Sequence, residues 1–149
     1  MQMTHGTWIE GMIQNFEEFC QMLKLPYHIV LIVSNALIDA VAKKYDLEVW
    51  FVASKTYKEL VSYSSCTDYQ SRKLEIRYGQ KKSNEQTKQY CHLLNSTLTA
   101  TEITLCCNIE NYMRDDGVVV HEMLQPFMGG QTLFLLMSDI LKKQQMERN

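Results

Sequence analysis

Apolar side chains recur at three- and four-residue steps between residues 8 and 23. Polar side chains such as Glu10, Gln14 and Gln21 fill the positions between them. Because an α-helix has 3.6 residues per turn, this spacing predicts an amphipathic helix with one buried face, which Pro26 brings to an end. The apolar positions are Trp8, Ile9, Met12, Ile13, Phe16, Phe19, Cys20 and Leu23.

Residues 27–34, YHIVLIVS, are almost entirely apolar and rich in β-branched side chains. A continuous apolar run of this length is typical of a strand that is covered on both faces, so we expect a central strand here. A short helix is expected to follow over residues 36–44.

Two β-rich runs, residues 46–54 and 57–65, are separated only by Lys55 and Thr56. The first run alternates apolar and polar side chains, as a strand with one buried face does. Because so short a connection favours a hairpin, we predict that the two strands are antiparallel neighbours.

The second half of the chain begins with a predicted helix over residues 69–76, for which Asp68 is the expected N-cap residue. The polar stretch 79–89 has no periodicity and is expected to be an exposed loop. A strand over residues 90–96 and a helix over residues 99–113 follow. Helices mixed with hairpin strands predict an α+β fold with a largely antiparallel sheet flanked by helices.

Length and composition indicate one globular domain. The chain has 149 residues, of which 46% are hydrophobic and 21% are charged, and its net charge is −2. That charge gives no general attraction to nucleic acid or to an anionic membrane. Five cysteines without a CxxC motif argue against a disulfide framework and a zinc site. We therefore expect a cytoplasmic protein with no membrane-spanning segment.

Glu59, Ser62 and Ser64 place polar groups on a strand that is otherwise suited to burial. Buried polar groups cost free energy unless they meet a partner or a ligand, so these residues mark a candidate site. Along a regular strand Glu59 and Ser62 lie on opposite faces, and only a bulge or a twist brings them together. A charge at a sheet edge is the alternative explanation for the glutamate.

A second polar cluster lies between the strand over residues 90–96 and the helix that follows it. Its members are Asn95, Ser96, Thr97 and Thr99. Either they line the floor of a site, or they cap the helix, which is a common role of Ser and Thr at this position. The sequence contains no Gly-rich phosphate loop, serine–histidine–aspartate order or HExxH motif.

Five stretches of the chain are distinctive when they are taken together: PYHIVLIVS, KKYDLEVWF, YKELVSYSSCTDYQSRKLEIRYGQKKSNEQTKQY, HLLNSTLTATE and IENYMRDDGVVV. They resemble the C-terminal part of the catalytic domain of cytosolic eukaryotic seryl-tRNA synthetase, in its plant-like form. The resemblance is collinear over residues 8–131 and is far more specific than one short motif. Residues 132–149 form a divergent tail, whose apolar start and charged end predict a turn and a frayed terminal helix.

The resemblance implies a class II aminoacyl-tRNA synthetase core, in which an antiparallel sheet is flanked by helices. It also implies serine-tRNA ligase chemistry: serine is joined to ATP, pyrophosphate is released, and the seryl group passes to tRNA. The implied cofactors are ATP and magnesium. The residues implied to bind ATP are Glu59, Leu60, Val61 and Ser62.

Glu59 and Ser62 are also implied to hold the magnesium ion, and Asn95 and Thr97 are implied to lie beside the bound serine. Oxygen ligands suit a hard cation, and amide and hydroxyl groups suit a small polar amino acid. The resemblance thus gives the two polar clusters a common function in one site.

The chain departs from the family pattern at Ile103, where the third class II motif carries an arginine that binds the ATP phosphates. Loss of such a donor costs about 3 kcal/mol, roughly a hundredfold in rate. We therefore expect ATP to bind weakly at best. At other family positions Asn35 stands for a glycine, Val52 for a proline, Tyr63 for a smaller residue and His121 for a proline.

The upstream segments of the family have no counterpart in this sequence: the first and second class II motifs, the threonine–glutamate segment that holds serine, and the N-terminal arm that grips tRNA. The first interpretation is a truncated seryl-tRNA synthetase-like protein that neither binds nor aminoacylates tRNA alone. One alternative is serine-tRNA ligase activity, alone or with a partner chain. Another is a non-catalytic module that binds a full-length synthetase or forms a homodimer. A gene fragment without a selected role is also consistent with the scattered substitutions.

Overall fold

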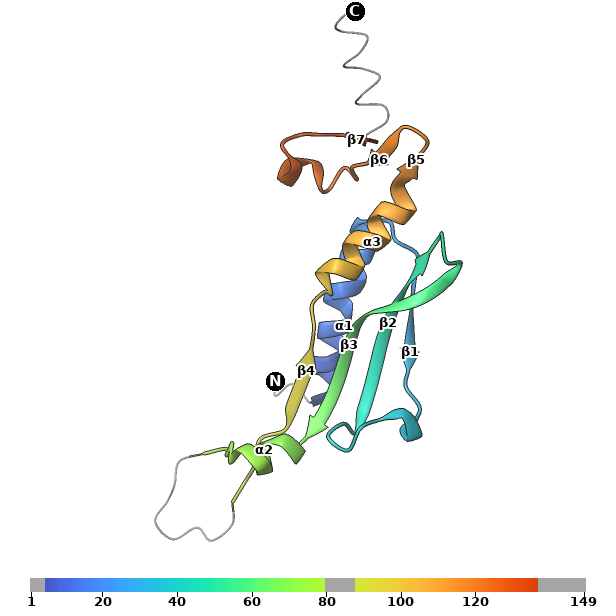
Figure 1. Cartoon of the computed structure of the whole chain (residues 1–149). Coiled ribbons are helices and arrows are strands. Elements are labelled where there is room, and N and C mark those ends of the chain that lie inside the picture. Colours follow the sequence, from blue (N-terminus) through green and yellow to red (C-terminus); the bar gives the residue numbers. More distant parts are fainter. Residues whose placement is uncertain (1–4, 80–87, 137–149) are drawn as a thin grey trace, which may run out of the picture.

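The protein is built around two antiparallel β-sheets (Figure 1). The computed structural model describes residues 5–79 and 88–136. The larger sheet has the strand order β1-β2-β3-β4, and the smaller one has the order β5-β6-β7. In chain order the elements are α1 (His5–Met22), β1 (Tyr27–Leu31), the 3₁₀-helix η1 (Ser34–Ala36), β2 (Lys43–Phe51), β3 (Thr56–Thr67), α2 (Tyr69–Leu74), β4 (Leu93–Ser96), α3 (Thr101–Tyr112), β5 (Met113–Arg114), β6 (Gly117–Val119), the 3₁₀-helix η2 (Gln125–Met128) and β7 (Leu133–Leu135).

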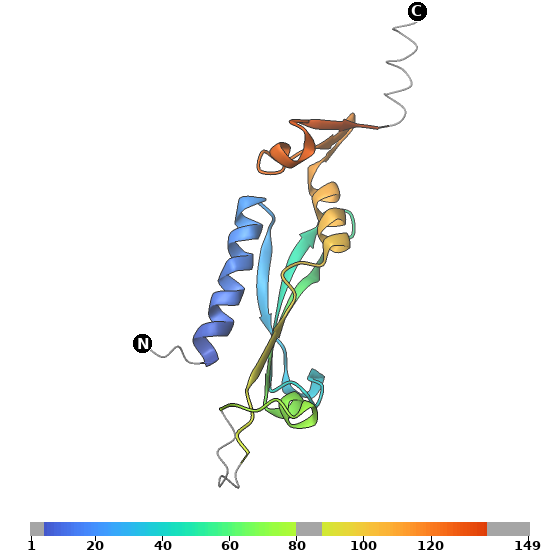
Figure 2. The ribbon, with the colours of Figure 1, turned by 90° about the vertical axis from the view of Figure 1, so that its left-hand side faces the viewer.

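Helix α1 lies along one face of the larger sheet (Figure 2) and confirms the helix predicted from the apolar periodicity. Phe16 and Cys20 of this helix are fully buried. The helix ends where Lys24 adopts a left-handed conformation, with φ of 51°, and the Leu25 N–H donates to the Cys20 carbonyl at 3.0 Å. The sheet residues in the same core are Leu47, Val49, Phe51, Leu60, Val61 and Tyr63.

Strand β1 is an edge strand, so the predicted central position is wrong. Among the described strands it pairs only with β2, and Ile29 and Leu31 are 38% and 55% exposed. Apolar β-branched residues favour a strand, but they do not determine where that strand lies in the sheet. The sheet therefore ends in a partly uncovered apolar edge.

The helix predicted over residues 36–44 is also wrong, because β2 already begins at Lys43. Lys43 and Lys44 pair with Ser65 and Ser64 of β3, respectively. Backbone pairing with a neighbouring strand outweighs the modest helix propensity of an alanine- and lysine-containing stretch.

Strands β2 and β3 form the predicted antiparallel hairpin. Their connection is a turn over Val52–Lys55 rather than the two residues expected, and Lys55 has a φ of 50°. The hairpin is the longest part of the larger sheet and carries most of the residues of interest.

Asp68 occupies the N-cap position of α2 but makes no capping hydrogen bond, contrary to the prediction. Its carboxylate instead pairs with the Arg72 guanidinium at 2.6 Å. A charged donor one turn along the helix competes successfully with backbone N–H groups for the same oxygens.

The other elements of the second half agree in type with the prediction and are shorter. Strand β4 covers only the end of the stretch 90–96, and Tyr90 forms an isolated bridge with Arg77. Helix α3 confirms the helix expected over residues 99–113. The predicted loop over residues 79–89 falls mainly on residues 80–87, which lie outside the described part.

The smaller sheet lies beyond the end of α3, away from the larger sheet (Figure 1). Strands β5 and β6 form a hairpin, and β7 pairs with β6. Leu133–Leu135 therefore form a strand where the sequence predicts an apolar turn, and the predicted terminal helix falls on residues 137–149, outside the described part. None of the described helices is long and apolar enough to cross a membrane.

Candidate functional site

The face of the larger sheet opposite α1 carries a band of polar side chains. Because side chains alternate along a strand, Leu47 and Val49 enter the core while Asp46 and Glu48 point to the opposite face. Cross-strand partners share a face, so Ser62, which pairs with Asp46, belongs to the same band. Helix α1 covers only the apolar side (Figure 2).

Glu59 joins this band because β3 contains a bulge. Two successive residues of β2 pair with Val61 and Glu59, so Leu60 is an extra residue without a cross-strand partner. Leu60 and Val61 are both buried, at 2% and 1% exposure, and Glu59 therefore returns to the face of Ser62. The bulge fulfils the condition under which Glu59 and Ser62 can meet.

Four side chains close a ring of hydrogen bonds on this face. Ser62 Oγ lies 2.8 Å from Asp46 Oδ1 and 2.5 Å from Glu59 Oε1. Lys44 Nζ lies 2.9 Å from Asp46 Oδ2 and 3.5 Å from Glu59 Oε2. Each carboxylate thus meets the hydroxyl through one oxygen and the ammonium through the other. We call these residues the carboxylate ring: Lys44, Asp46, Glu59 and Ser62.

The carboxylate ring has two formal negative charges and one positive charge. Asp46 is buried, at 4% exposure, whereas the Glu59 side chain is 49% exposed. Burial alone would lower the pKa of Lys44, but the hydrogen bond to Asp46 and the charges of Asp46 and Glu59 outweigh this effect and raise the pKa. Lys44 therefore stays cationic, and the ring keeps a formal excess of negative charge.

Asn95 lies on the same face as the ring. It pairs with Ser64 across β3 and β4, and Ser64 is two residues from Ser62 along β3. Thr97 follows the end of β4 and is exposed, as Asn95 is. Within residues 5–79 and 88–136 neither side chain has a hydrogen-bond partner. Asn95 is therefore accessible to a ligand at the open face, and Thr97 is accessible just beyond the end of the strand.

The alternative role of this second cluster, capping of the next helix, does not occur. Helix α3 begins at Thr101 with Ala100 at the N-cap position and has no side-chain capping bond. Thr99 instead makes a hydroxyl–hydroxyl contact with Thr104. Helix capping therefore does not explain the second polar cluster.

Ile103 lies on the side of α3 that faces the end of the β2–β3 hairpin. It precedes Cys107 by one helical turn and Glu110 by two. The Cys107 thiol lies 3.7 Å from the Trp50 carbonyl, and Glu110 accepts from the Ala53 N–H at 3.0 Å. Ile103 is 38% exposed and places no charge on this side of the helix.

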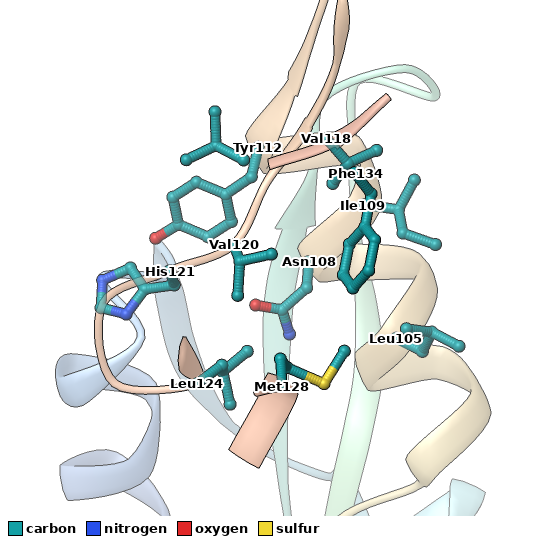
Figure 3. Close-up of a pocket in the computed structure, with 11 residues that line it drawn as sticks. Leu105, Asn108, Ile109, Tyr112, Val118, Val120, His121, Leu124, Met128 and Phe134 are labelled. Carbon is teal, nitrogen blue, oxygen red and sulfur yellow. The ribbon is translucent and has the colours of Figure 1, made fainter. Parts of the chain in front are cut away.

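An apolar pocket of about 290 Å³ lies between α3 and the smaller sheet (Figure 3). Its walls include Leu105, Ile109, Met128 and Phe134. A nucleotide needs charged and hydrogen-bonding groups, and this lining offers few of them: besides the Tyr112 hydroxyl, only Asn108 and His121 have polar side-chain atoms. The carboxylate ring is therefore the better candidate for polar chemistry.

Comparison with known proteins identifies the family of this chain. The tRNA synthetase class II core domain (G, H, P, S and T) matches residues 4–112. The chain belongs to the class II tRNA synthetase family. The serine–tRNA ligase of Helianthus annuus is 72% identical over 134 residues, and the cytoplasmic serine–tRNA ligase of Arabidopsis thaliana is 70% identical over 130 residues. These matches cover 90% and 86% of this chain, but 30% and 29% of the relatives.

Solved structures agree with this assignment to the class II family. The cytoplasmic serine–tRNA ligase from Naegleria fowleri in complex with AMP superimposes with a TM-score of 0.82 at 51% identity, over 87% of this chain and 31% of that one. The seryl-tRNA synthetase from Pyrococcus horikoshii complexed with ATP gives a TM-score of 0.77 at 36% identity, over 87% and 29%. The predicted α+β class II fold and the resemblance to plant-like cytosolic synthetases are confirmed. The chain spans about 30% of the length of the curated relatives it matches.

The carboxylate ring of this class II core offers a donor set that fits magnesium. Asp46 and Glu59 supply carboxylate oxygens and Ser62 supplies a hydroxyl, and Mg²⁺ is usually held by one or two carboxylates together with water and substrate phosphates. The described part of the chain contains no group of three or more His, Cys, Asp and Glu residues that could hold a metal ion. With two carboxylates and one hydroxyl, the ring could hold a metal ion only if water or phosphate oxygens completed its coordination.

The sequence alone identifies Glu59 and Ser62 but misses the other two residues of the carboxylate ring. It places Lys44 in a helix and gives Asp46 no role. The missed signal is the alternation of β2, which extends back to Lys44 and puts Lys44, Asp46 and Glu48 on one face.

Proposed function

We propose that this chain carries the part of a seryl-tRNA synthetase catalytic core that contacts ATP and serine. We propose further that these 149 residues alone bind ATP weakly and do not aminoacylate tRNA. The observation that carries the proposal is the 2.5 Å contact between Ser62 and Glu59 on the open face of the sheet. It joins the two groups that the resemblance assigns to ATP and its magnesium ion.

In this proposal the two ends of the segment 59–62 hold ATP. Glu59 and Ser62 present their oxygens on the open face, where they would hold the magnesium ion. Leu60 and Val61 have their side chains in the core, so they contribute to ATP binding through main-chain groups at the bulge. Magnesium, when bound, neutralises the negative charge of the phosphates.

Asn95 and Thr97 bind the serine substrate in this proposal. An amide and a hydroxyl both donate and accept hydrogen bonds, and this matches the ammonium, carboxylate and hydroxyl groups of serine. The pairing of Asn95 with Ser64 supports this assignment, because it places the serine-binding strand directly beside the strand of the carboxylate ring. Serine and ATP would then be held side by side, which favours reaction between them.

Ile103 is the reason that we propose weak ATP binding. Phosphate groups are stabilised by positive charge that is already in place before they bind. Isoleucine provides none on the sheet-facing side of α3, and Lys44 in the ring is already bonded to two carboxylates. Among the described residues that we assign to the site, none therefore offers a free cation for the phosphate tail.

A second candidate function is binding to a full-length synthetase, and the open edge at β1 favours it. Ile29, Leu31 and Val33 are 38%, 55% and 65% exposed. An edge strand with apolar side chains and free backbone groups is suited to strand addition by a partner. The same edge would serve a homodimer, or a partner chain that completes the ligase activity. Co-purification with a full-length synthetase would favour this function.

The remaining assignments follow from the relatives. We propose a cytoplasmic location, because several of the matched serine–tRNA ligases are named cytoplasmic. We also propose that residues 8–131 form the synthetase-like unit and that residues 132–149 form a divergent tail.

Thermal unfolding with a non-hydrolysable seryl-adenylate analogue tests the proposed function. A ligand that binds only the folded state raises the unfolding midpoint, so we expect a rise at saturating analogue. Asn95→Ala should abolish the rise, and Asn35→Ala, at another exposed asparagine, should retain it. An unchanged midpoint for the unsubstituted protein would contradict the proposal.

A further inference from the structure

Lys44 is the cation of the carboxylate ring and touches both of its carboxylates. Its Nζ lies 2.9 Å from Asp46 Oδ2 and 3.5 Å from Glu59 Oε2. Its side chain is only 27% exposed, and its backbone is fixed by pairing with Ser64 in the ladder between β2 and β3. The ammonium group is therefore held inside the ring.

A divalent metal ion in the ring needs the oxygens that Lys44 already contacts. Mg²⁺ binds oxygen at about 2.0–2.1 Å, which leaves no space for an ammonium group between the same two carboxylates. The other two carboxylate oxygens, Asp46 Oδ1 and Glu59 Oε1, lie within hydrogen-bond distance of the Ser62 hydroxyl, whose single proton they share. Every carboxylate oxygen of the ring thus has a partner within the ring.

We propose that Lys44 is the internal counter-ion of the carboxylate ring and competes with the divalent metal ion for Asp46 and Glu59. This inference rests on the proposed function, which places magnesium at the ring. The two cations exclude each other by space and by mutual repulsion, which is strong at a few ångströms in a partly buried site. Metal binding therefore requires the Lys44 ammonium to leave the ring.

Lys43 provides a matched control for Lys44. It is the preceding residue of β2, points to the other face and is exposed, and its Nζ lies 4.8 Å from the centre of the Tyr45 ring. Substitution of either lysine by methionine removes one positive charge from the same strand and keeps a long flexible side chain. Only the substitution at Lys44 removes a cation that contacts the carboxylates.

Titration with Mn²⁺ alone, followed by the electron paramagnetic resonance signal of the free ion, tests the proposal. We expect Lys44→Met to bind Mn²⁺ roughly tenfold or more tightly than the unsubstituted protein, because the competing charge is gone. Lys43→Met should stay within about twofold, because its charge is exposed and screened. Equal affinities for the two variants, or weaker binding by Lys44→Met, would overturn the proposal.

Lys44→Met leaves the buried Asp46 without its counter-ion and can therefore destabilise the fold. A second measurement avoids this problem because it uses the unsubstituted protein. Acetic anhydride labels accessible amines of the unsubstituted protein, and mass spectrometry locates the labels. We expect Mn²⁺ to increase labelling of Lys44 and to leave labelling of Lys43 unchanged. Constant labelling of Lys44 across the Mn²⁺ titration would also overturn the proposal.

These outcomes are separable from those that test the proposed function. If Mn²⁺ competes with Lys44 but the seryl-adenylate analogue does not raise the unfolding midpoint, the competition stands and the proposed function fails. If the analogue raises the midpoint but Mn²⁺ affinity is independent of Lys44, the proposed function stands and the competition fails.

Discussion

The two faces of the larger sheet are built from the same strands but have different surroundings. On the face covered by α1, Leu47 and Val49 are fully buried together with Phe16 of the helix. On the open face, Glu59 is exposed, and its side chain contacts Ser62 and Lys44. Alternation along the strands lets one hairpin contribute to the core and to a polar site at the same time.

This difference indicates which substitutions change the free energy of unfolding and which change ligand affinity. Burial of apolar surface contributes about 25 cal/mol per Å², whereas exposed ion pairs contribute at most about 1 kcal/mol. We therefore expect the free energy of unfolding to depend on the covered face and ligand affinity to depend on the open face.

The largest effect is expected from Phe16→Ala on the covered face. Phe16 is 0% exposed, and loss of a buried phenyl ring costs about 3–5 kcal/mol of unfolding free energy. Phe127→Ala, at a position that is 84% exposed, is the matched control and should change stability by at most about 0.5 kcal/mol. Urea unfolding of both variants measures this difference. Similar losses for the two would contradict the assignment of the core to the covered face.

A smaller effect is expected from alkaline pH. Burial, reinforced by Cys107 and Glu17, raises the pKa of Cys20 from 9.0 to about 12. The thiol of the unfolded chain ionises first, so this contribution to stability is complete below pH 9 and is lost as the pH rises toward 12. The slope is roughly 1 kcal/mol per pH unit.

Urea unfolding at a series of pH values between 8 and 10 measures this slope. Cys20→Val should reduce it, because valine does not ionise, and should leave the contribution of Cys107, whose pKa burial raises to about 11; Cys106→Val, at an exposed cysteine, should not change the slope. An unchanged slope in Cys20→Val would contradict the contribution of Cys20.

The covered face also contains one polar defect, and its removal should stabilise the protein. Tyr63 is 1% exposed, and its hydroxyl has no hydrogen-bond partner among the described residues. Tyr63→Phe keeps the ring and removes the unpaired group, so we expect a gain of about 1 kcal/mol in unfolding free energy. Tyr57→Phe, at a position that is 37% exposed, should be near neutral. A loss of stability in Tyr63→Phe alone would mean that the hydroxyl has a partner.

The smallest effect on stability is expected on the open face. Glu59→Gln keeps the shape of the side chain and should change the free energy of unfolding by at most about 0.5 kcal/mol, because the Glu59 side chain is 49% exposed. The same variant should bind Mn²⁺ more weakly. If it is as unstable as Phe16→Ala, the carboxylate ring is a structural feature and the contrast between the two faces fails.

The sequence predicts the elements whose patterns are long and regular. The apolar periodicity before Pro26 identifies α1, and the short connection at Lys55 and Thr56 identifies the hairpin. The sequence does not predict that β1 is an edge strand or that β2 begins at Lys43, because both depend on which strands are available for pairing. The intrinsic β-propensity of a residue does not depend on which strands are available to pair with it.

In the candidate site, too, some features follow from the local sequence and others depend on strand pairing. Glu59 and Ser62 can be identified as candidates from their polarity on an apolar strand, but their meeting depends on a bulge at Leu60 that only the pairing register reveals. Lys44 is missed because the sequence predicts a helix over residues 36–44, and Asp46, at the start of the predicted strand 46–54, is missed because its pairing with Ser62 depends on the register. The serine-binding role of Asn95 and Thr97 stays a prediction.

The most direct test of the central claim is calorimetric titration of ATP with magnesium into the unsubstituted protein, Ile103→Arg and Leu105→Arg. Leu105 is 61% exposed and lies on another side of α3, so its variant controls for net charge. We predict weak binding by the unsubstituted protein and Leu105→Arg, and roughly tenfold to hundredfold tighter binding by Ile103→Arg, because a hydrogen bond between charged groups contributes about 1.5–3 kcal/mol. Tight binding by the unsubstituted protein, or equal affinity for all three, would contradict the account.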